Sequence, residues 1–346
     1  MKKIKFPFFS LLNLLIFTFC GTVNFQPVYA QAVIEAAETL RLYDKVGDQG
    51  RVPVVKCIDL AAGGRFLAAG GDDHIVRIWD TAARKFTAEL REHRDWIRSL
   101  AFSPDRTKLV TVAQDGQIRI WNVSDGHLLH SFKQPVRGTQ QIRFRPDGSQ
   151  FAVCGFDQNI RIYDAGSYRL TATLPAHSTN NEAMDYSADG SLLAAGGRTG
   201  KVRLWRTADN KHLADTDGDS RRVRAVVFSP DGSLLAAGGD GPFITLWNPQ
   251  NGKLIKPFAE RPGKTCALAF CGNDTLASGE SDNVIRIWNI AAGTQTAVLS
   301  GHTGTISAIL YDSASQKLIS SGFDASVRFW TLPARTATPA LPAAAF

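Results

Sequence analysis

Short runs of alternating apolar and polar residues follow one another along most of the chain, separated by turns rich in Gly, Asp and Pro. The run IRSLAF (97–102) precedes the turn SPDR, and the turn SADG precedes SLLAAGG (191–197). Alternation with a period of two residues predicts β-strands, and Pro, Asp and Gly at fixed places favour tight hairpin turns. The chain is therefore predicted to be all-β and antiparallel.

One unit of this pattern repeats seven times. Its aromatic residue recurs at spacings of 42, 42, 42, 42, 41 and 42 residues, at Trp79, Trp121, Tyr163, Trp205, Trp247, Trp288 and Trp330. Each unit reads as strand a, an a–b turn, strand b, a b–c turn, strand c ending at the aromatic residue, and a more variable strand d. Four short strands in about 42 residues are typical of one β-propeller blade.

These units resemble the WD repeat. VRIWD (76–80) and IRIYD (160–164) keep an aromatic residue followed by Asp, whereas the other units have Asn, Arg or Thr in the last place. The chain resembles the WD40-type family over about residues 38–332. The resemblance implies a seven-bladed β-propeller of four-stranded antiparallel blades.

Closure of the ring can be predicted from the two ends of the repeat region. Three prolines after Trp330 exclude a normal strand d in blade 7. The segment TLRLYDKV (39–46) precedes blade 1 and is predicted to complete blade 7, which removes a free edge. The propeller is expected over residues 31–332, followed by a flexible Pro/Ala-rich tail over residues 333–346.

The first thirty residues read as a secretory signal peptide. Three lysines precede an apolar run from Phe6 to Cys20, and VYA (28–30) offers small residues before a cleavage site at Gln31. We therefore expect an exported, bacterial-type member of the family, located in the periplasm or secreted. An uncleaved segment would instead attach the protein to a membrane.

The net charge limits which partners are expected, and the cysteine spacing limits which disulfides are expected. Removing residues 1–30 lowers the formal net charge from +7 to +4, which is mild, and no run of Lys or Arg exceeds two, so nucleic acid is not expected. The cysteines are far apart or poorly spaced for bridging, and no structural disulfide is expected. A monomer or one part of a hetero-complex is expected.

Two blades carry residues that look like a hydrolase triad with an added Trp. They are His93, Thr111, Asp115 and Trp121 in blade 2, and His302, Ser320, Asp324 and Trp330 in blade 7. In the WD40 family these positions form a buried structural network, so a structural role is favoured. The other blades lack one or more of these four residues, and blade 6 has Glu260 in place of the His. Those blades are expected to be stabilised mainly by packing.

Two further patterns suggest ion sites and are better explained without them. Arg stands two residues before the aromatic residue in every blade except blade 5, and we expect these side chains to pack their stems and expose their charged ends. Asp215, Asp217 and Asp219 alternate as in a calcium loop but lack its Gly and final acid. A solvated loop is favoured, and a weak calcium site stays open.

Partner binding is expected on the face formed by the d–a loops and the b–c turns, hereafter the b–c face. In the WD40 family three positions per blade point outward there. Trp, Phe and Arg, which are enriched at interface hot spots, occupy several of them. The predicted partner-binding residues are Trp96, Arg98, Phe156, Arg198, Arg222, Arg224 and Phe323.

The predicted function is a non-catalytic interaction scaffold that binds a protein or peptide partner. The aromatic residues would contribute contact area, and the arginines would select an acidic segment of the partner. No catalytic residue, cofactor or metal site is predicted. The alternatives are a propeller enzyme of the hydrolase or lyase type and a structural subunit held at a membrane by an uncleaved N-terminus.

Overall fold

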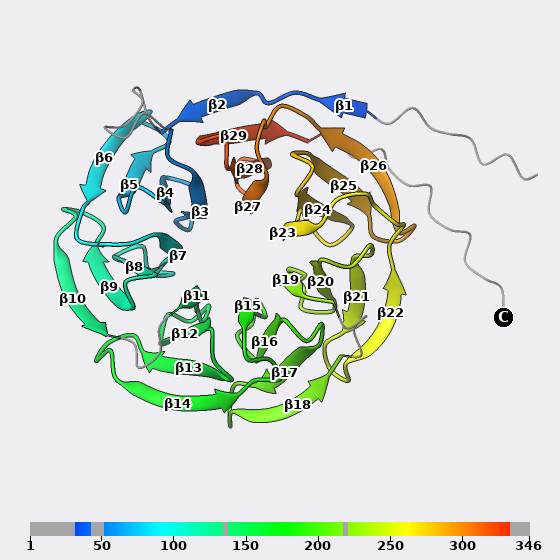
Figure 1. Cartoon of the computed structure of the whole chain (residues 1–346), viewed down its shortest axis with the longest axis horizontal. Coiled ribbons are helices and arrows are strands. Elements are labelled where there is room, and N and C mark those ends of the chain that lie inside the picture. The colour runs from blue at the N-terminus through cyan, green and yellow to red at the C-terminus, as the bar shows by residue number, and fades with distance from the viewer. Residues whose placement is uncertain (1–31, 43–51, 134–137, 217–220, 333–346) are drawn as a thin grey trace, which may run out of the picture. The chain divides into compact units, whose positions relative to one another are not determined.

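Seven β-sheets stand around one axis in the computed structural model (Figure 1). The structure describes residues 32–42, 52–133, 138–216 and 221–332. The predicted signal peptide (1–30) and tail (333–346) lie outside the described residues. The prediction of a seven-bladed propeller with four-stranded antiparallel blades is confirmed.

The innermost strand of each blade is strand a, which lines the axis (Figure 1). These strands are β3 (Val55–Leu60), β7 (Ile97–Phe102), β11 (Thr139–Phe144), β15 (Asn181–Tyr186), β19 (Val223–Phe228), β23 (Thr265–Phe270) and β27 (Ile306–Asp312). Strand b follows as β4 (Phe66–Gly71), β8 (Lys108–Ala113), β12 (Gln150–Gly155), β16 (Leu192–Gly197), β20 (Leu235–Gly239), β24 (Thr275–Glu280) and β28 (Lys317–Gly322).

Strand c carries the repeated aromatic residue. The strands are β5 (Val76–Asp80), β9 (Gln117–Asn122), β13 (Asn159–Asp164), β17 (Val202–Arg206), β21 (Thr245–Asn248), β25 (Ile285–Asn289) and β29 (Ser326–Thr331). Strand d lies on the circumference as β6 (Lys85–Leu90), β10 (Leu128–Lys133), β14 (Leu170–Pro175), β18 (Lys211–Asp215), β22 (Lys253–Pro257) and β26 (Thr294–Leu299).

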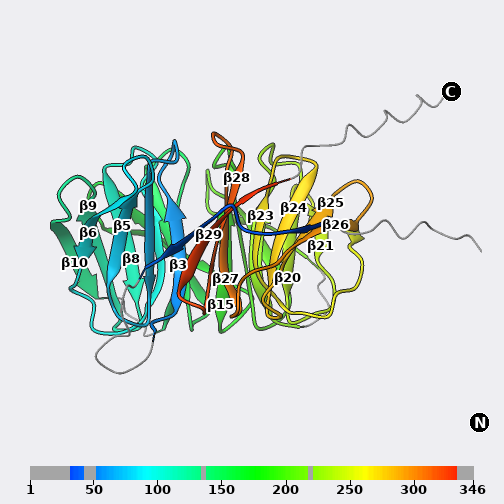
Figure 2. The same cartoon turned by 90° about the horizontal axis from the view of Figure 1, so that it is seen from above.

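Blade 7 takes its fourth strand from the N-terminal side of the propeller. Strand β2 (Glu38–Arg41) pairs antiparallel with β29, with Leu40 opposite Val327. The predicted closure is therefore confirmed, although the strand ends at Arg41 and residues 43–46 of the predicted segment lie outside the described part. Figure 2 shows β2 running along the outside of the sheet that contains β29.

A second N-terminal strand was not predicted. Strand β1 (Ala32–Ile34) pairs in parallel with β26, the outer strand of blade 6, and makes that blade five-stranded. The partly buried Ile34 and Ala36 pack against the core between blades 6 and 7. The N-terminal segment therefore spans two blades across the closure point.

Apolar cores lie between the blades rather than within them. Within the described residues seven buried clusters occur, and each joins two neighbouring blades. The cluster between blades 7 and 1, for example, contains Leu42, Val55, Ile58, Ile319 and Val327. No blade can bury its apolar faces without both neighbours, so the ring has to close.

Candidate functional site

Blades 2 and 7 each contain a closed hydrogen-bond network around a buried His. In blade 7 the two ring nitrogens of His302 lie 2.9 Å from an Asp324 oxygen and 2.8 Å from Ser320 Oγ. Trp330 Nε1 donates to the same Ser320 oxygen at 2.8 Å. In blade 2 His93, Asp115, Thr111 and Trp121 repeat this arrangement with distances between 2.7 and 3.0 Å.

The surroundings of these groups suit a structural role better than catalysis. The Thr111 and Ser320 side chains are completely buried, so no substrate reaches either hydroxyl. Burial alone would raise the pKa of Asp324, but hydrogen bonds from His302 and the Thr303 amide lower it below the usual value. The carboxylate therefore stays ionised and ties the b–c turn to the d–a loop.

Blade 6 contains a different buried network, which corrects the expectation that it holds mainly by packing. Glu280 occupies the strand b end, where most blades have Gly, and its Oε1 lies 3.2 Å from Arg261 Nε, with both side chains at most 1% exposed. Ser278 Oγ donates to the Glu280 carboxylate at 2.7 Å and accepts from Trp288 Nε1 at 2.8 Å. An ion pair thus replaces the missing His.

The predicted exposure of the six repeated arginines is wrong for most of them. Four are at most 9% exposed and bond, four residues back, to the turn Asp of the same blade: Arg77, Arg119, Arg161 and Arg286. The guanidinium groups are buried because each neutralises a carboxylate that caps the b–c turn. In blade 5 the exception Thr245 instead accepts the Trp247 Nε1 proton at 2.9 Å.

The b–c turns and the starts of strand a lie side by side on one face. In all seven blades the amide at one turn position donates to the carbonyl just before strand a, for example Gln114 to Trp96, Phe156 to Gly138, Arg198 to Asn180 and Phe323 to Thr305. All seven predicted partner-binding residues belong to these two kinds of segment. The backbone therefore fixes where each of their side chains starts.

Two of the predicted aromatic residues stand well out of the fold. The side chains of Phe156 and Phe323 are 49% and 45% exposed, respectively. Phe156 packs its ring over Gly138, where a Cβ atom would lie 2.2 Å from the ring. Gly138 therefore leaves room for this ring, and both phenyl groups keep an open side toward solvent.

Trp96 and Arg98 form a small unit at the start of blade 2. The Arg98 guanidinium lies 5.4 Å from the centre of the Trp96 ring and donates to Gln114 Oε1 at 2.6 Å. Both side chains are half-buried. Stacking of this kind holds the arginine in one orientation and leaves part of the indole accessible.

The predicted basic arc is partly neutralised within the chain. Arg222 and Arg224 lie 3.2 and 3.8 Å from the Glu182 carboxylate, and Arg224 also bonds to Asp240 at 2.7 Å. The exposed guanidinium of Arg198 makes no ion pair with any residue that the structure describes. Of the three arginines, Arg198 is therefore the one most available to an acidic partner.

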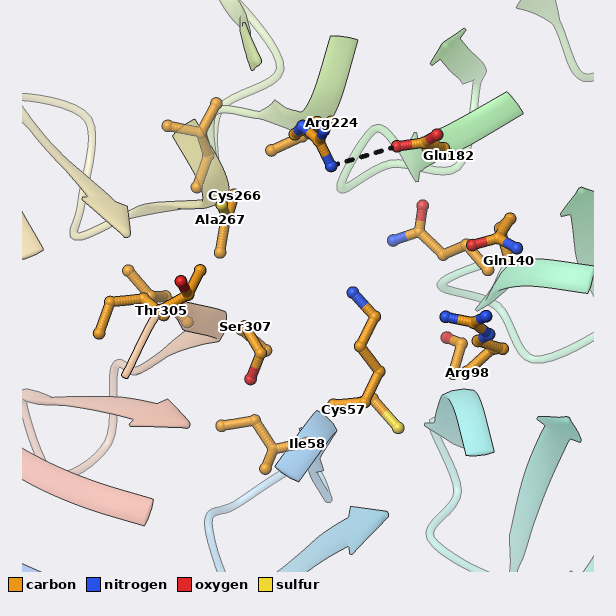
Figure 3. Close-up of a pocket in the computed structure, with 18 of the residues that line it drawn as sticks. Cys57, Ile58, Arg98, Gln140, Glu182, Arg224, Cys266, Ala267, Thr305 and Ser307 are labelled. Atoms are coloured by element: carbon orange, nitrogen blue, oxygen red, sulfur yellow. Dashed lines mark ion pairs between the residues drawn. The ribbon is translucent and has the colours of Figure 1, made fainter. Parts of the chain in front are cut away.

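A cavity of about 360 Å³ opens at the b–c end of the central channel. It brings together three of the predicted residues, Arg98, Arg224 and Phe323, whereas the other four do not line it. Figure 3 shows Arg98, Gln140, Glu182 and Arg224 around this space, with Ser307 across from them. Sequence reasoning missed Lys56, Glu182 and Lys264 as lining residues, although Lys56 and Glu182 occupy the same repeat position as Arg98.

Deeper in the channel, two carboxylates flank one arginine. Asp59 and Asp185 accept the backbone N–H groups of Phe102 and Phe228 at 2.7 and 3.0 Å. Arg143 Nε lies 3.8 Å from Asp185. Burial raises the pKa of each carboxyl to about 6, because the nearby arginine and the amide bonds offset only part of the desolvation.

Other predicted ion sites receive no support from the described residues. Asp215 bonds to Arg203 and His212. Its neighbours Asp217 and Asp219 lie outside the described part, so a weak calcium site in this loop stays a prediction. In the described ranges no group of three His, Cys, Asp or Glu side chains could hold a metal ion. None of the four cysteines in those ranges forms a disulfide: Cys57, Cys154, Cys266 and Cys271.

Across residues 32–42, 52–133, 138–216 and 221–332, no helix has both the length and the apolar character needed to cross a membrane.

The architecture defines a class: a closed seven-bladed β-propeller with a His/Asp/Trp network in two of its blades. The family described as "IFT122 first beta-propeller" matches residues 99–340, and the family "WD domain, G-beta repeat" matches residues 47–80. The chain belongs to the WD40-repeat β-propeller family, whose members are typically non-catalytic protein-interaction scaffolds.

Similar proteins match over short stretches. WD repeat-containing protein pop1 of Schizosaccharomyces pombe is 28% identical over 108 residues, 24% of this chain and 14% of that protein. Superkiller complex protein 8 of Dictyostelium discoideum is 45% identical over 56 residues, 16% and 19% of the two chains. Topless-related protein 3 of Arabidopsis thaliana is 32% identical over 82 residues, which are 23% of this chain and 7% of that protein. The matched stretches cover less than a fifth of each relative.

Replacing Asp324 by Ala should lower the free energy of unfolding by about 3 kcal/mol, because His302 and the Thr303 amide would lose a buried partner. Urea denaturation measures the change. Asp125→Ala, which removes an exposed Asp that accepts the His127 amide, is the matched control and should cost under about 1 kcal/mol. Equal small effects of the two substitutions would contradict the structural role.

Stability should also fall as the pH rises through the pKa of Asp59 and Asp185. Their folded pKa of about 6 exceeds the value of about 4 for unfolded Asp. The stabilisation is therefore fully present below about pH 4 and is lost as the pH passes about 6. The double variant Asp59→Asn/Asp185→Asn should remove a decrease of about 4 kcal/mol, about 2 kcal/mol for each carboxyl, between pH 4 and 7 in urea denaturation. A variant with the unchanged pH profile would contradict the assignment.

Proposed function

We propose that this chain is an exported, non-catalytic scaffold that binds a protein or peptide partner on its b–c face. The main support is the position of Phe323, which stands 45% exposed on a b–c turn and also lines the mouth of the central cavity. An aromatic ring held by a rigid turn contributes contact area at a low cost in conformational entropy. Phe156 and the Trp96–Arg98 unit extend the same face over blades 2 and 3.

The charge of the face refines the kind of partner. Because Arg222 and Arg224 already bind Glu182 and Asp240, a partner gains little by pairing with them again. Arg198 is exposed and makes no ion pair with the described residues. We therefore propose a partner segment with apolar side chains for the aromatic residues and an acidic side chain for Arg198.

Export is proposed from residues 1–30 together with the position of the first described strand. Ala32 already pairs with Ala297 of blade 6. Cleavage before Gln31 would therefore leave both closing strands, β1 and β2, on the mature chain. This supports a mature protein that keeps its closure, located in the periplasm or secreted.

Affinity capture from the source cells, followed by identification of the bound protein, provides the partner for a quantitative test. The double variant Trp96→Ala/Phe323→Ala should weaken its binding at least about tenfold, because central aromatic side chains dominate interface energies. Phe86→Ala removes a 39% exposed ring from outer strand β6 and should leave the dissociation constant within about twofold. A folded double variant with unchanged affinity would contradict this face.

N-terminal sequencing tests the export proposal separately. Protein recovered from the periplasm or medium should begin at Gln31, because the signal segment ends in the small residues of VYA. A chain that begins at Met1 and sediments with membranes would contradict cleavage and support the membrane-held alternative.

A further inference from the structure

The lining of the central cavity is strongly biased toward cations. Its charged residues are Lys56, Arg98, Arg143, Arg224 and Lys264, against the single carboxylate of Glu182. Several of the cations have carboxylates of their own: Arg224 and Lys264 lie 2.7 and 3.9 Å from Asp240. Arg143 lies 3.8 Å from Asp185.

Lys56 and Arg98 have no such counter-charge. Among the described residues no carboxylate lies within 4 Å of either cationic group, and the Lys56 ammonium makes no hydrogen bond there. Arg98 bonds to Gln114 through one terminal nitrogen, while its Nε is buried without an acceptor. Two cationic donors therefore meet at the channel mouth with unused hydrogen-bonding capacity.

The surroundings of both cations disfavour their charged forms. Burial lowers the pKa of Lys56, and the positive charge of Arg98 lowers it further. Burial likewise lowers the pKa of Arg98. Leaving charged donors desolvated and unpaired costs free energy, and an anion placed between them would remove both penalties.

Glu182 does not supply that anion from within the chain. Its carboxylate accepts from Asn180 Nδ2 at 3.0 Å and lies 3.2 and 3.8 Å from Arg222 and Arg224. Figure 3 shows Glu182 turned toward Arg224 on the far side of Gln140 from Arg98. The Lys56–Arg98 side of the cavity therefore stays positive.

We propose that this cavity is a binding site for a compact polyanion with carboxylate or phosphate oxygens, held between Lys56 and Arg98. A volume of about 360 Å³ admits a molecule of this size. The lysine supplies a point charge and the arginine a planar pair of donors, which together suit an oxygen anion. The anion is a free small molecule or the acidic side chain of a docked peptide, and the two sources share this chemistry.

Isothermal titration calorimetry on the full chain at constant ionic strength tests the site with three probes: citrate, inorganic phosphate and a blocked tetraglutamate peptide. Saturable one-to-one binding of at least one probe is expected. Lys56→Met, which keeps the apolar stem, should weaken it about tenfold, the usual effect of one lost charge-assisted hydrogen bond. Lys253→Met, on exposed outer strand β22, is the matched control and should change nothing.

A second variant acts in the opposite direction and remains informative if Lys56→Met fails to fold. Glu182→Gln removes the one carboxylate of the lining and should strengthen binding severalfold. Binding of citrate or phosphate without the peptide assigns a free anion, and binding of the peptide assigns an acidic side chain. Absence of saturable binding by all three probes, or equal affinities in all the variants, would overturn the site. The titration needs no partner, so its failure is separate from failure of the proposed face.

Discussion

Closure of the ring by the N-terminal strands is the constraint on which the rest of the molecule depends. Each apolar core is shared by two neighbouring blades, so an unclosed ring would expose one face of blade 7 and one face of blade 1. Strand β2 covers the edge of β29, and β1 continues onto blade 6. The segment between residues 32 and 42 thus joins the end of the repeat array to its beginning, and it converts seven mutually dependent sheets into one closed unit.

The functional surface follows from that closure. The seven strands a surround the channel only when all blades are in place, and backbone bonds then fix each b–c turn beside the start of strand a. Buried networks within the blades, such as Asp324 with His302 and Arg161 with Asp157, hold the same turns from below. Phe156, Phe323 and the Trp96–Arg98 unit are therefore presented on a rigid frame, and Lys56 on β3 and Arg98 on the neighbouring strand β7 line the same cavity.

The repeat of about 42 residues predicted the fold, the blade order and the strand that completes blade 7, because periodicity and proline placement are local signals. Side-chain contacts within the blades were harder to predict. The six arginines looked like surface residues, yet most are buried because each bonds to a carboxylate four residues earlier. Arg261 and Glu280 stand in different segments, and no spacing rule joins them. The importance of Lys56 depends on which of the seven equivalent positions in strand a hold a charge and on which of those charges are already paired. The parallel pairing of β1 could not be predicted because it has no counterpart in the repeat.

Hydrogen exchange of the strand c amides tests closure most directly. Strand β29 lies between β28 and β2, as β21 lies between β20 and β22, whereas β22 forms the outer edge of its four-stranded sheet. If β2 closes the ring, the amides of β29 should exchange as slowly as those of β21 and far more slowly than those of β22. Exchange of β29 as fast as that of β22 would contradict closure by the N-terminal strand.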